Sequence, residues 1–480
     1  MSLVPCGDSV CLGEEIGTVP HCPHGPALLF ERHYDGGSRK FYTCSACRDR
    51  KECSFFQWAD EKVSAAKLKA REAHNEASQP KYTHQQFYER FKKFQKLAAA
   101  DHIFCDDCQL LLLPEDKAVH AEHKCRLLKP QAIHRPSSLL KPLDNKKVNA
   151  QYLFSDKSVN FVLGLAKEFG YKKLLCIGTP RIHEAVCQLD SEKPVFNMTS
   201  LLLDIDHRYE QFYSPKRFCR YNMFNHYFFG NSEAEGTFRD FLCNDPGSVL
   251  LITDPPFGGL VEIIAQTMHK ISSLWQHSST EKEDMINNGL TKDCHLKIPV
   301  LFMFPYFMEP KINFSLPSLH MLDYKIDYEN HLHFQSGTKS NKKGSPVRIF
   351  TNLNLSKVIL PVDEGYRFCH KCQRYVSSEN RHCDKCQSCP SKNGQTYKHC
   401  NLCEKCVKPS WTHCNKCGYC AHSEHKCGTS DEKNPACHSC GKLGHKKREC
   451  PNNRKKLGYK KRHLEDSAVP GKKKKLKNKR

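Results

Sequence analysis

The stretch Gly247–Leu260 reads GSVLLITDPPFGGL and decides the fold. Val249–Thr253 is a short, continuous apolar run, which is typical of a strand buried in the middle of a parallel sheet. Asp254 and two prolines end this run. An Asp-Pro pair alone predicts only a turn. Behind a buried strand it also predicts a ligand site, because open α/β sheets bind ligands at the carboxyl ends of their strands.

Apolar runs alternate with helical patterns on both sides of this stretch. Strands are predicted at KKLLCIG, SLLLDID, FCRYNMF and IPVLFMF, and helices at RIHEAVCQL and LVEIIAQTMHKISSLW. The last two runs, HLHF and VRIFTNL, favour a hairpin. Strands separated by helices predict an α/β domain with a parallel sheet over residues 149–361.

The length of 480 residues indicates two to four domains, at roughly 100–200 residues each. A mean hydropathy of −0.63 with 39% hydrophobic residues predicts a soluble protein. No apolar run approaches the about 18 residues that a membrane span needs. The first residues, MSLVPCGDSVCLGEE, lack the pattern of a secretory signal. We therefore expect a reducing compartment and no membrane partner.

Cysteine and histidine are abundant, with 29 and 27 residues. In a reducing compartment such density predicts structural zinc ions rather than disulfides. The first group lies within residues 20–60 and offers the ligands Cys22, His24, Cys44 and Cys53, with Cys47 as an alternative to Cys44. Its ligand spacing and its FFQWAD ending resemble the GRF zinc finger of nucleic-acid enzymes. Four protein ligands predict a structural site.

Charges and rings interleave in the same module, as a binder of single strands would need. The residues concerned are Arg39, Lys40, Phe55, Phe56 and Trp58, although more than half of these rings are expected in the core. Residues 61–100 follow as a basic helical linker. Phe87, Phe91 and Phe94 share one face there, which favours packing against a neighbouring domain over a helix that faces RNA.

A second metal group lies within residues 101–130. Cys105, Cys108 and His120 are its firm ligands. Either His123 or Cys125 completes the set, and family resemblance favours His123. The run QLLLL is strand-like and the run EDKAVHAEH is helix-like, which fits a ββα finger.

Residues 366–428 form a third region rich in cysteine and histidine. It repeats the pattern HC-x-x-C-x-x-C three times, after one C-x-x-C pair, and contains little apolar sequence, so zinc must supply its folding energy. The expected ligands are Cys369, Cys372, His382, Cys383, Cys386, Cys389, His399, Cys400, Cys403, Cys406, His413, Cys414, Cys417, Cys420, His425 and Cys427. The region resembles the cysteine-rich part of DHHC palmitoyltransferases. Thr412 precedes His413 and Cys414, so the catalytic DHHC sequence is absent, and membrane spans are also missing, which argues against lipid transfer.

Residues 435–452 match a retroviral zinc knuckle. Its ligands are Cys437, Cys440, His445 and Cys450, and knuckles bind unstacked bases of RNA. A knuckle for protein interaction is the alternative. Residues 453–480 form a basic tail, which we expect to be disordered. Its segment Arg454–Arg480 carries 13 basic and 2 acidic residues, so its own net charge of +11 is half of the net charge of +22 of the whole chain. Attraction to nucleic acid or nuclear import is favoured over a role in solubility.

The central motifs QYLFSDKSVNFV, LLCIGTPRIHEAV, LLLDIDHRY, RYNMFNH, LITDPPF and VLFMFP resemble, in this order, a class I S-adenosylmethionine-dependent methyltransferase. The match is to the amino-group branch whose motif is DPP followed by an aromatic residue. Together with the zinc segments, nearly the whole chain resembles the zinc-finger CCHC-domain ribosomal RNA adenosine N6-methyltransferases of animals. The resemblance implies a Rossmann-like sheet flanked by zinc modules.

The same resemblance implies the site residues. Asp254, Pro255, Pro256 and Phe257 would be catalytic, because the first two can accept hydrogen bonds from an exocyclic amine and the ring can stack on the base. The cofactor S-adenosyl-L-methionine would lie against Gln151, Tyr152, Phe154, Gly178, Thr179, Pro180, Asp204, Asp206, Asn222 and Met223. A single glycine follows the first strand, so the usual glycine-rich fingerprint is missing and a degenerate domain remains an alternative.

The motif DPPF identifies an amine acceptor and not RNA as such, because the same branch includes methyltransferases of protein lysines. A protein-lysine methyltransferase and a non-catalytic RNA-binding scaffold are therefore the competing hypotheses. The zinc modules and the basic tail favour RNA. The resemblance implies a structured RNA of the large ribosomal subunit (28S) as substrate and partner. It also implies ribosome-biogenesis or RNA-processing proteins as further partners, and the nucleus and nucleolus, with the cytoplasm in addition, as locations.

Overall fold

The computed structural model describes residues 7–12, 18–34, 37–47, 51–142, 152–192, 198–279, 295–330, 344–425 and 427. The chain divides into two compact units. The first unit comprises the residues up to Ser378 together with Lys392–Gly394, and the second comprises Glu379–Ser391 and the residues from Gln395 onward. Among the helices in the described ranges, none is long and apolar enough to cross a membrane.

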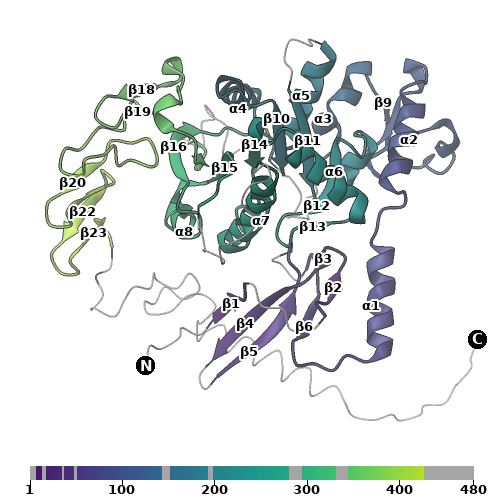
Figure 1. Ribbon diagram of the computed structural model, residues 1–480, viewed down its shortest axis with the longest axis horizontal. Helices are drawn as coiled ribbons and strands as arrows, with labels where there is room; N and C mark the ends of the chain where they lie inside the picture. The colour runs from purple at the N-terminus through teal and green to yellow at the C-terminus, as the bar shows by residue number, and fades with distance from the viewer. Residues whose placement is uncertain are drawn as a thin grey trace, which may run out of the picture. The chain divides into compact units, whose positions relative to one another are not determined.

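The first unit is built on a sheet of eight strands, drawn mainly in teal and green in Figure 1. Its order is β13 (Tyr227–Phe228), β12 (Phe218–Asn222), β11 (Thr199–Asp204), β10 (Lys173–Ile177), β14 (Val249–Thr253), β15 (Val300–Pro305), β17 (Val347–Thr351) and β16 (His320–Lys325). The five strands from β12 to β15 pair in parallel. β13 pairs antiparallel with β12, and β17 pairs antiparallel with both β15 and β16.

The predicted strands and helices of this domain that fall within the described residues are present. KKLLCIG, SLLLDID, FCRYNMF, IPVLFMF and VRIFTNL contain β10, β11, β12, β15 and β17. HLHF, the expected hairpin partner of VRIFTNL, lies outside the described residues. Within the described residues, β17 has its antiparallel partners in β15 and in β16, a strand that the sequence did not predict.

Alternation along the strands gives the sheet two apolar faces, because successive side chains of a strand point to opposite sides. Leu174 and Cys176 of β10 belong to one core cluster, and Leu175 and Ile177 belong to the other. The first cluster includes side chains of α4 (Asp156–Glu168) and α5 (Pro180–Glu192). The second includes side chains of α6 (Asn231–Cys243), α7 (Val261–Ser279) and α8 (Glu309–Ser315).

The N-terminal zinc module is the sheet drawn in purple in Figure 1. Its order is β1 (Gly7–Val10), β4 (Leu28–Tyr34), β5 (Gly37–Thr43) and β6 (Phe56–Trp58), with a small hairpin of β2 (His21–Cys22) and β3 (Gly25–Pro26). Phe30 and Phe41 belong to the same core cluster as the side chains of α6 and α7. The module therefore packs on that face of the eight-stranded sheet.

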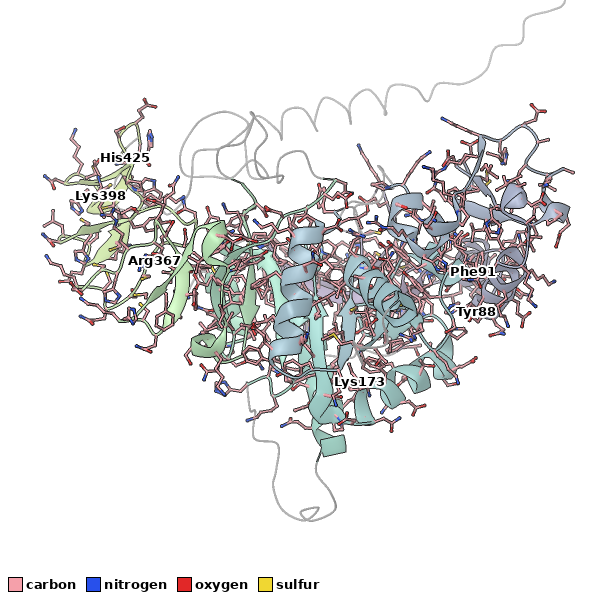
Figure 2. All side chains as sticks on the ribbon, turned by 90° about the horizontal axis from the view of Figure 1, so that it is seen from above. Tyr88, Phe91, Lys173, Arg367, Lys398 and His425 are labelled. Atoms are coloured by element: carbon pink, nitrogen blue, oxygen red, sulfur yellow. The ribbon has the colours of Figure 1, made fainter. Side chains whose placement is uncertain are left out.

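The linker contains α1 (Ala65–Ala77) and α2 (His84–Phe94). Phe87, Phe91 and Phe94 are buried along α2, as predicted, and the Phe91 ring lies 6.1 Å from that of Phe212. Figure 2 shows Phe91 beside Tyr88 on this helix. The second zinc module follows as the sheet β8 (Leu110–Leu112), β7 (Ile103–Cys105) and β9 (Cys125–Leu127).

The helix predicted at EDKAVHAEH is wrong. The segment begins with the 3-10 helix Pro114–Asp116 and continues as turns up to His123. Two constraints explain the difference. Cys125 already begins β9, which pairs with β7, and His120 and His123 must both turn toward Cys105 and Cys108. Too few residues remain for a regular helix.

The remaining short elements complete both units. The other helices are η1 (Ala99–Asp101), η3 (Pro130–His134), α3 (Pro136–Leu139), η4 (His207–Gln211), η5 (Pro246–Ser248), η6 (Tyr306–Met308), η7 (Leu355–Lys357) and η8 (Val362–Glu364). The hairpin of β18 (Tyr366–Cys369) and β19 (Arg374–Ser377) belongs to the first unit. The second unit contains the hairpins of β20 (Lys398–Cys400) with β21 (Lys405–Val407) and of β22 (Trp411–Cys414) with β23 (Tyr419–His422).

Candidate active site and zinc clusters

The candidate site begins where β10 and β14 end, side by side in the centre of the sheet. The Asp254 N–H donates to the Ile177 carbonyl at 3.3 Å. Gly178 has φ +65°, and a Cβ added there would lie 3.2 Å from both the Asp254 carbonyl oxygen and Met223 Cε. Only glycine fits this position without strain. Three residues predicted for the site, Gly178, Met223 and Asp254, therefore meet here.

The Asp254 carboxylate has a partner that sequence reasoning missed. The Tyr328 hydroxyl donates to it, at 3.1 Å from Oδ1 and 3.2 Å from Oδ2. Burial raises the pKa of Asp254 well above its ordinary value, and this hydrogen bond opposes the shift. Burial also raises the pKa of Tyr328, as does the neighbouring Asp254 charge, so the hydroxyl keeps its proton.

Aromatic rings lie close to Phe257, three residues after Asp254. The Phe257 ring lies 6.4 Å from those of Tyr152 and Tyr328 and 6.2 Å from that of Phe304. Tyr152 is exposed and roughly parallel to Phe257, whereas Tyr328 and Phe304 are buried. Pro255 is buried as well. The DPPF motif therefore has apolar neighbours and one exposed ring, Tyr152, beside Phe257.

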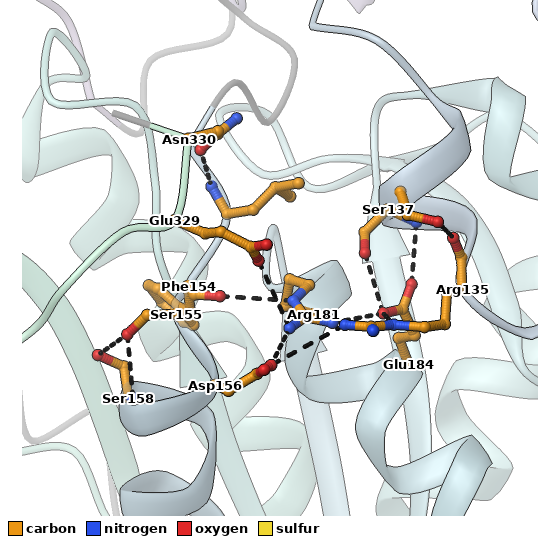
Figure 3. A network of polar contacts seen from close by, with 12 residues as sticks. Arg135, Ser137, Phe154, Ser155, Asp156, Ser158, Arg181, Glu184, Glu329 and Asn330 are labelled. Atoms are coloured by element: carbon orange, nitrogen blue, oxygen red, sulfur yellow. Dashed lines mark hydrogen bonds and ion pairs between the residues drawn. The ribbon is translucent and has the colours of Figure 1, made fainter. Parts of the chain in front are cut away.

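An ion-pair network holds the segments that carry these rings (Figure 3). Arg181, at the start of α5, pairs with Asp156 and Glu184 and lies 3.7 Å from a Glu329 oxygen. Its Nε also donates to the Phe154 carbonyl at 3.4 Å. Arg181 and Glu184 are buried, whereas Asp156 and Glu329 are mostly exposed, so only the pair with Glu184 is desolvated. Together the contacts of Arg181 connect the segment at Phe154 to the segment at Glu329.

Asp204 and Asp206, at the end of β11, differ in their partners. Asp206 binds the Arg208 guanidinium with both oxygens, at 2.5–3.1 Å. Asp204 Oδ1 accepts from the Asp206 N–H at 2.9 Å, while Oδ2 is buried and has no hydrogen-bond partner within the described residues. Burial and the charge of Asp206 raise the pKa of Asp204 to about 7. Asp204 therefore keeps an unused acceptor.

Asn222 contacts the N-terminal zinc module. Its Nδ2 donates to the His24 carbonyl and to Ser45 Oγ, each at 2.8 Å, and its Oδ1 accepts from the Phe224 N–H at 3.0 Å. Both ends of the Asn222 side-chain amide are thus engaged in hydrogen bonds within the protein. Among the other predicted cofactor residues, Phe154 and Thr179 are buried and Pro180 begins α5. Gln151 lies outside the described residues.

In the first unit, the ligands of each of two predicted zinc groups lie close to one another. The ligand atoms of Cys22, His24, Cys44 and Cys53 all lie within 4.8 Å of one another, and so do those of Cys105, Cys108, His120 and His123. Cys47 lies close to the first group, with its Sγ 3.7 Å from His24 Nε2. The thiol of Cys125 instead donates to the His120 carbonyl at 3.7 Å.

The second unit contains two further groups, which interleave along the chain. They are Cys383, Cys386, His399 and Cys406, and Cys400, Cys403, His413 and Cys420. A third set is close as well, with Cys414 Sγ 3.0 Å from Cys427 Sγ and Cys417 Sγ 3.5 Å from His425 Nε2. The pairing that the sequence left open is therefore between neighbouring repeats, and not within one repeat.

The last four predicted ligands of this region belong partly to the first unit and partly to the second. Cys369 ends β18 and Cys372 follows in the turn to β19, both in the first unit, while His382 and Cys389 belong to the second unit. The knuckle ligands Cys437, Cys440, His445 and Cys450 lie outside the described residues, as does the basic tail.

The face predicted to bind single strands is largely occupied by its own contacts. Arg39 pairs with Asp60 at 2.8 Å and lies over the Trp58 ring at 4.1 Å. Phe56 packs edge to face on Trp58 with ring centres 5.1 Å apart. These rings stabilise the module itself, in line with the expectation that most of them are core.

Comparison with known proteins follows the same division of the chain. A family model described as "Probable N6-adenine methyltransferase" matches residues 145–354, a GRF zinc finger matches residues 20–62 and a zinc knuckle matches residues 435–452. The rRNA N(6)-adenosine-methyltransferase ZCCHC4 of Homo sapiens is 48% identical over 438 residues, which are 90% of this chain and 83% of the human protein. ZCCHC4 of Xenopus laevis is 51% identical over 450 residues, 93% and 89% of the two chains. The chain belongs to this family.

As a member of the ZCCHC4 family, the chain is an S-adenosyl-L-methionine-dependent methyltransferase whose Cys/His groups bind zinc. Two features of the structure fit the cofactor. One is the close approach of Gly178, with φ +65°, to Asp254 and Met223, where an added Cβ would lie only 3.2 Å from each. The other is the buried, unpartnered oxygen of Asp204, because ribose hydroxyls are donors that could satisfy it.

Proposed function

We propose that this chain methylates the N6 amine of an adenosine in ribosomal RNA. The observation that carries the proposal is the position of Asp254, directly after the central strand β14 and in hydrogen-bond contact with Tyr328. The exocyclic amine of adenine is a poor nucleophile, because its lone pair is delocalised into the ring. A carboxylate that accepts one amine hydrogen, with the Pro255 carbonyl accepting the other, localises the lone pair on nitrogen.

The other parts of the motif position the base. Phe257 offers a ring on which an extruded adenine can stack, an interaction worth about 1–3 kcal/mol. The cofactor, when bound, supplies an electrophilic methyl group on a sulfonium. After transfer the nitrogen carries one hydrogen too many, and the Asp254 carboxylate can accept that proton and pass it to water. Alignment and charge placement account for the rate enhancement.

We also propose that the eight-stranded sheet is the Rossmann-like sheet of a class I methyltransferase. Five parallel strands with β10 at the centre, helices on both faces and one antiparallel strand, β17, inserted beside the edge strand β16 support this assignment. In such sheets the ligand lies beyond the carboxyl ends of the central strands. Gly178, Asp204 and Asp254 follow or end three of these adjacent strands.

Within this frame we assign the cofactor contacts. Asp204 would accept from the ribose hydroxyls, because Asp206 is already bound to Arg208. Gly178 and Met223 would line the methionine and adenine ends. Asn222 would contribute only through its backbone, since its amide binds His24 and Ser45.

The proposed substrate is a structured RNA of the large ribosomal subunit (28S). The names of the ZCCHC4 relatives, the knuckle match and the basic tail support an RNA substrate. The family resemblance supports the large subunit as the source of this RNA. It also supports a nuclear and nucleolar location with the cytoplasm in addition, and contacts with ribosome-biogenesis or RNA-processing proteins.

A labelling experiment tests the proposed function. The full chain is incubated with methyl-labelled cofactor and either total cellular RNA or total protein, and we expect label on N6-methyladenosine in ribosomal RNA. Asp254→Ala should reduce the rate at least about 100-fold, because a preorganised acceptor is removed. Asp240→Ala, an exposed change on α6, is the matched control. Label on protein lysines instead would refute the proposal.

A further inference from the structure

We propose that Tyr328 is a positioning residue for methyl transfer, whose hydroxyl holds the Asp254 carboxylate in the orientation and charge state that the amine requires. The inference rests on the proposed function and deepens it. It assigns a role to a residue outside the DPPF motif and 74 positions away in the sequence.

The geometry of the hydrogen bond is specific. The Tyr328 hydroxyl lies 3.1 and 3.2 Å from the two carboxylate oxygens, so one donor is shared between both. Such a donor fixes the plane of the carboxylate. Each oxygen keeps lone pairs, so Asp254 can still accept from an amine. Tyr328 is 1% exposed, and packing therefore holds its ring in place.

The backbone around Tyr328 is fixed from two sides. Tyr328 forms an antiparallel bridge with Phe154, and their rings lie 5.4 Å apart. The Glu329 N–H donates to the Leu153 carbonyl at 2.8 Å, and the Leu153 N–H donates to Asn330 Oδ1 at 2.8 Å. Arg181 adds its contacts with Phe154 and Glu329 (Figure 3). These contacts fix the backbone on both sides of Tyr328 and so hold its hydroxyl next to Asp254.

The surroundings of Asp254 explain why a donor is needed. Gly178, Met223 and the Phe257 ring offer no charge, and the titratable Tyr152 stands at the exposed edge. A carboxyl buried in such a setting tends to keep its proton, and a protonated carboxyl is a poor acceptor. The hydrogen bond from Tyr328 favours the charged form, because a bond to a carboxylate is stronger than one to a neutral acid.

The variant Tyr328→Phe tests the inference, because it removes the hydroxyl and keeps the ring. Tyr324→Phe is the matched control. Tyr324 is also fully buried, and within the described part of the chain its hydroxyl has no hydrogen-bond partner. For both variants we would measure kcat on RNA between about pH 6 and pH 9, the Kd of the cofactor, and the thermal unfolding midpoint.

We expect the acid limb of the kcat profile of Tyr328→Phe to move to higher pH by about one to two units, with about a tenfold loss at pH 7. The rate should recover toward pH 9, and the Kd of the cofactor should stay within about twofold. Tyr324→Phe should keep the profile of the unchanged protein. An unshifted profile, or an equal loss at every pH, would overturn the role of Tyr328. Absence of RNA methylation by the unchanged protein would refute the proposed function instead.

Discussion

At the scale of single residues, two neighbouring aspartates show how partners decide chemistry. Asp204 and Asp206 are both buried, yet their pKa values move in opposite directions. Burial acts to raise the pKa of Asp206, but the hydrogen bonds and charge of Arg208 outweigh it and lower the pKa. Asp204 has no such partner, so burial and the Asp206 charge raise its pKa to about 7. Asp204 therefore changes its charge close to neutral pH.

This difference predicts a pH dependence of cofactor binding. The charged form of Asp204 accepts hydrogen bonds from ribose more strongly than the neutral acid does. Since the pKa of the free site is about 7, affinity should fall as pH decreases through 7, by about tenfold between pH 8 and pH 6. Isothermal titration calorimetry of the cofactor measures it. Asp204→Asn should bind more weakly and without this pH dependence, while Asp240→Asn should behave like the unchanged protein. A constant affinity across this range would contradict the assignment.

The sequence predicted part of this site. Asp254 and Phe257 could be predicted because they follow a continuous apolar strand, and a buried strand fixes where its carboxyl end lies. Tyr328 could not, because it belongs to no periodic pattern and reaches Asp254 through the arrangement of the sheet. The choice between Asp204 and Asp206 also depended on Arg208, whose direction no sequence pattern gives.

At the scale of secondary structure, the apolar runs sufficed for the central strands, since each is buried on both faces. β16 was missed, because HMLDYK at the edge of the sheet mixes polar and apolar residues. In the second zinc module, by contrast, the sequence predicted a helix that does not form. His120 and His123 turn toward Cys105 and Cys108 instead of continuing a helix. Tertiary constraints therefore outweighed local propensity.

That module gives a prediction about metal content. His123→Ala should lose about one zinc ion per chain and lower the thermal midpoint, because a structural zinc site needs four ligands and supplies folding energy. Cys125→Ser should retain the metal, since its thiol donates to the His120 carbonyl and is not among the four clustered ligands. Mass spectrometry of the intact protein and elemental analysis count the ions. Loss of zinc in Cys125→Ser but not in His123→Ala would reverse the ligand assignment.

At the scale of the whole molecule, positive charge is concentrated far along the chain from the DPPF motif. Residues 454–480 carry half of the net charge of +22, and the knuckle match ends at residue 452.

Binding through phosphates releases counterions, so the slope of log affinity against log salt becomes shallower by about 0.7–0.9 for each phosphate that is no longer neutralised. Removal of residues 453–480 should therefore weaken RNA binding and flatten its salt dependence. Cys437→Ser should weaken binding through the bases and change the slope less. Fluorescence anisotropy with a ribosomal RNA fragment between about 50 and 200 mM salt separates the two effects. If the tail deletion leaves the slope unchanged, the basic residues do not bind phosphate, and their role is confined to localisation.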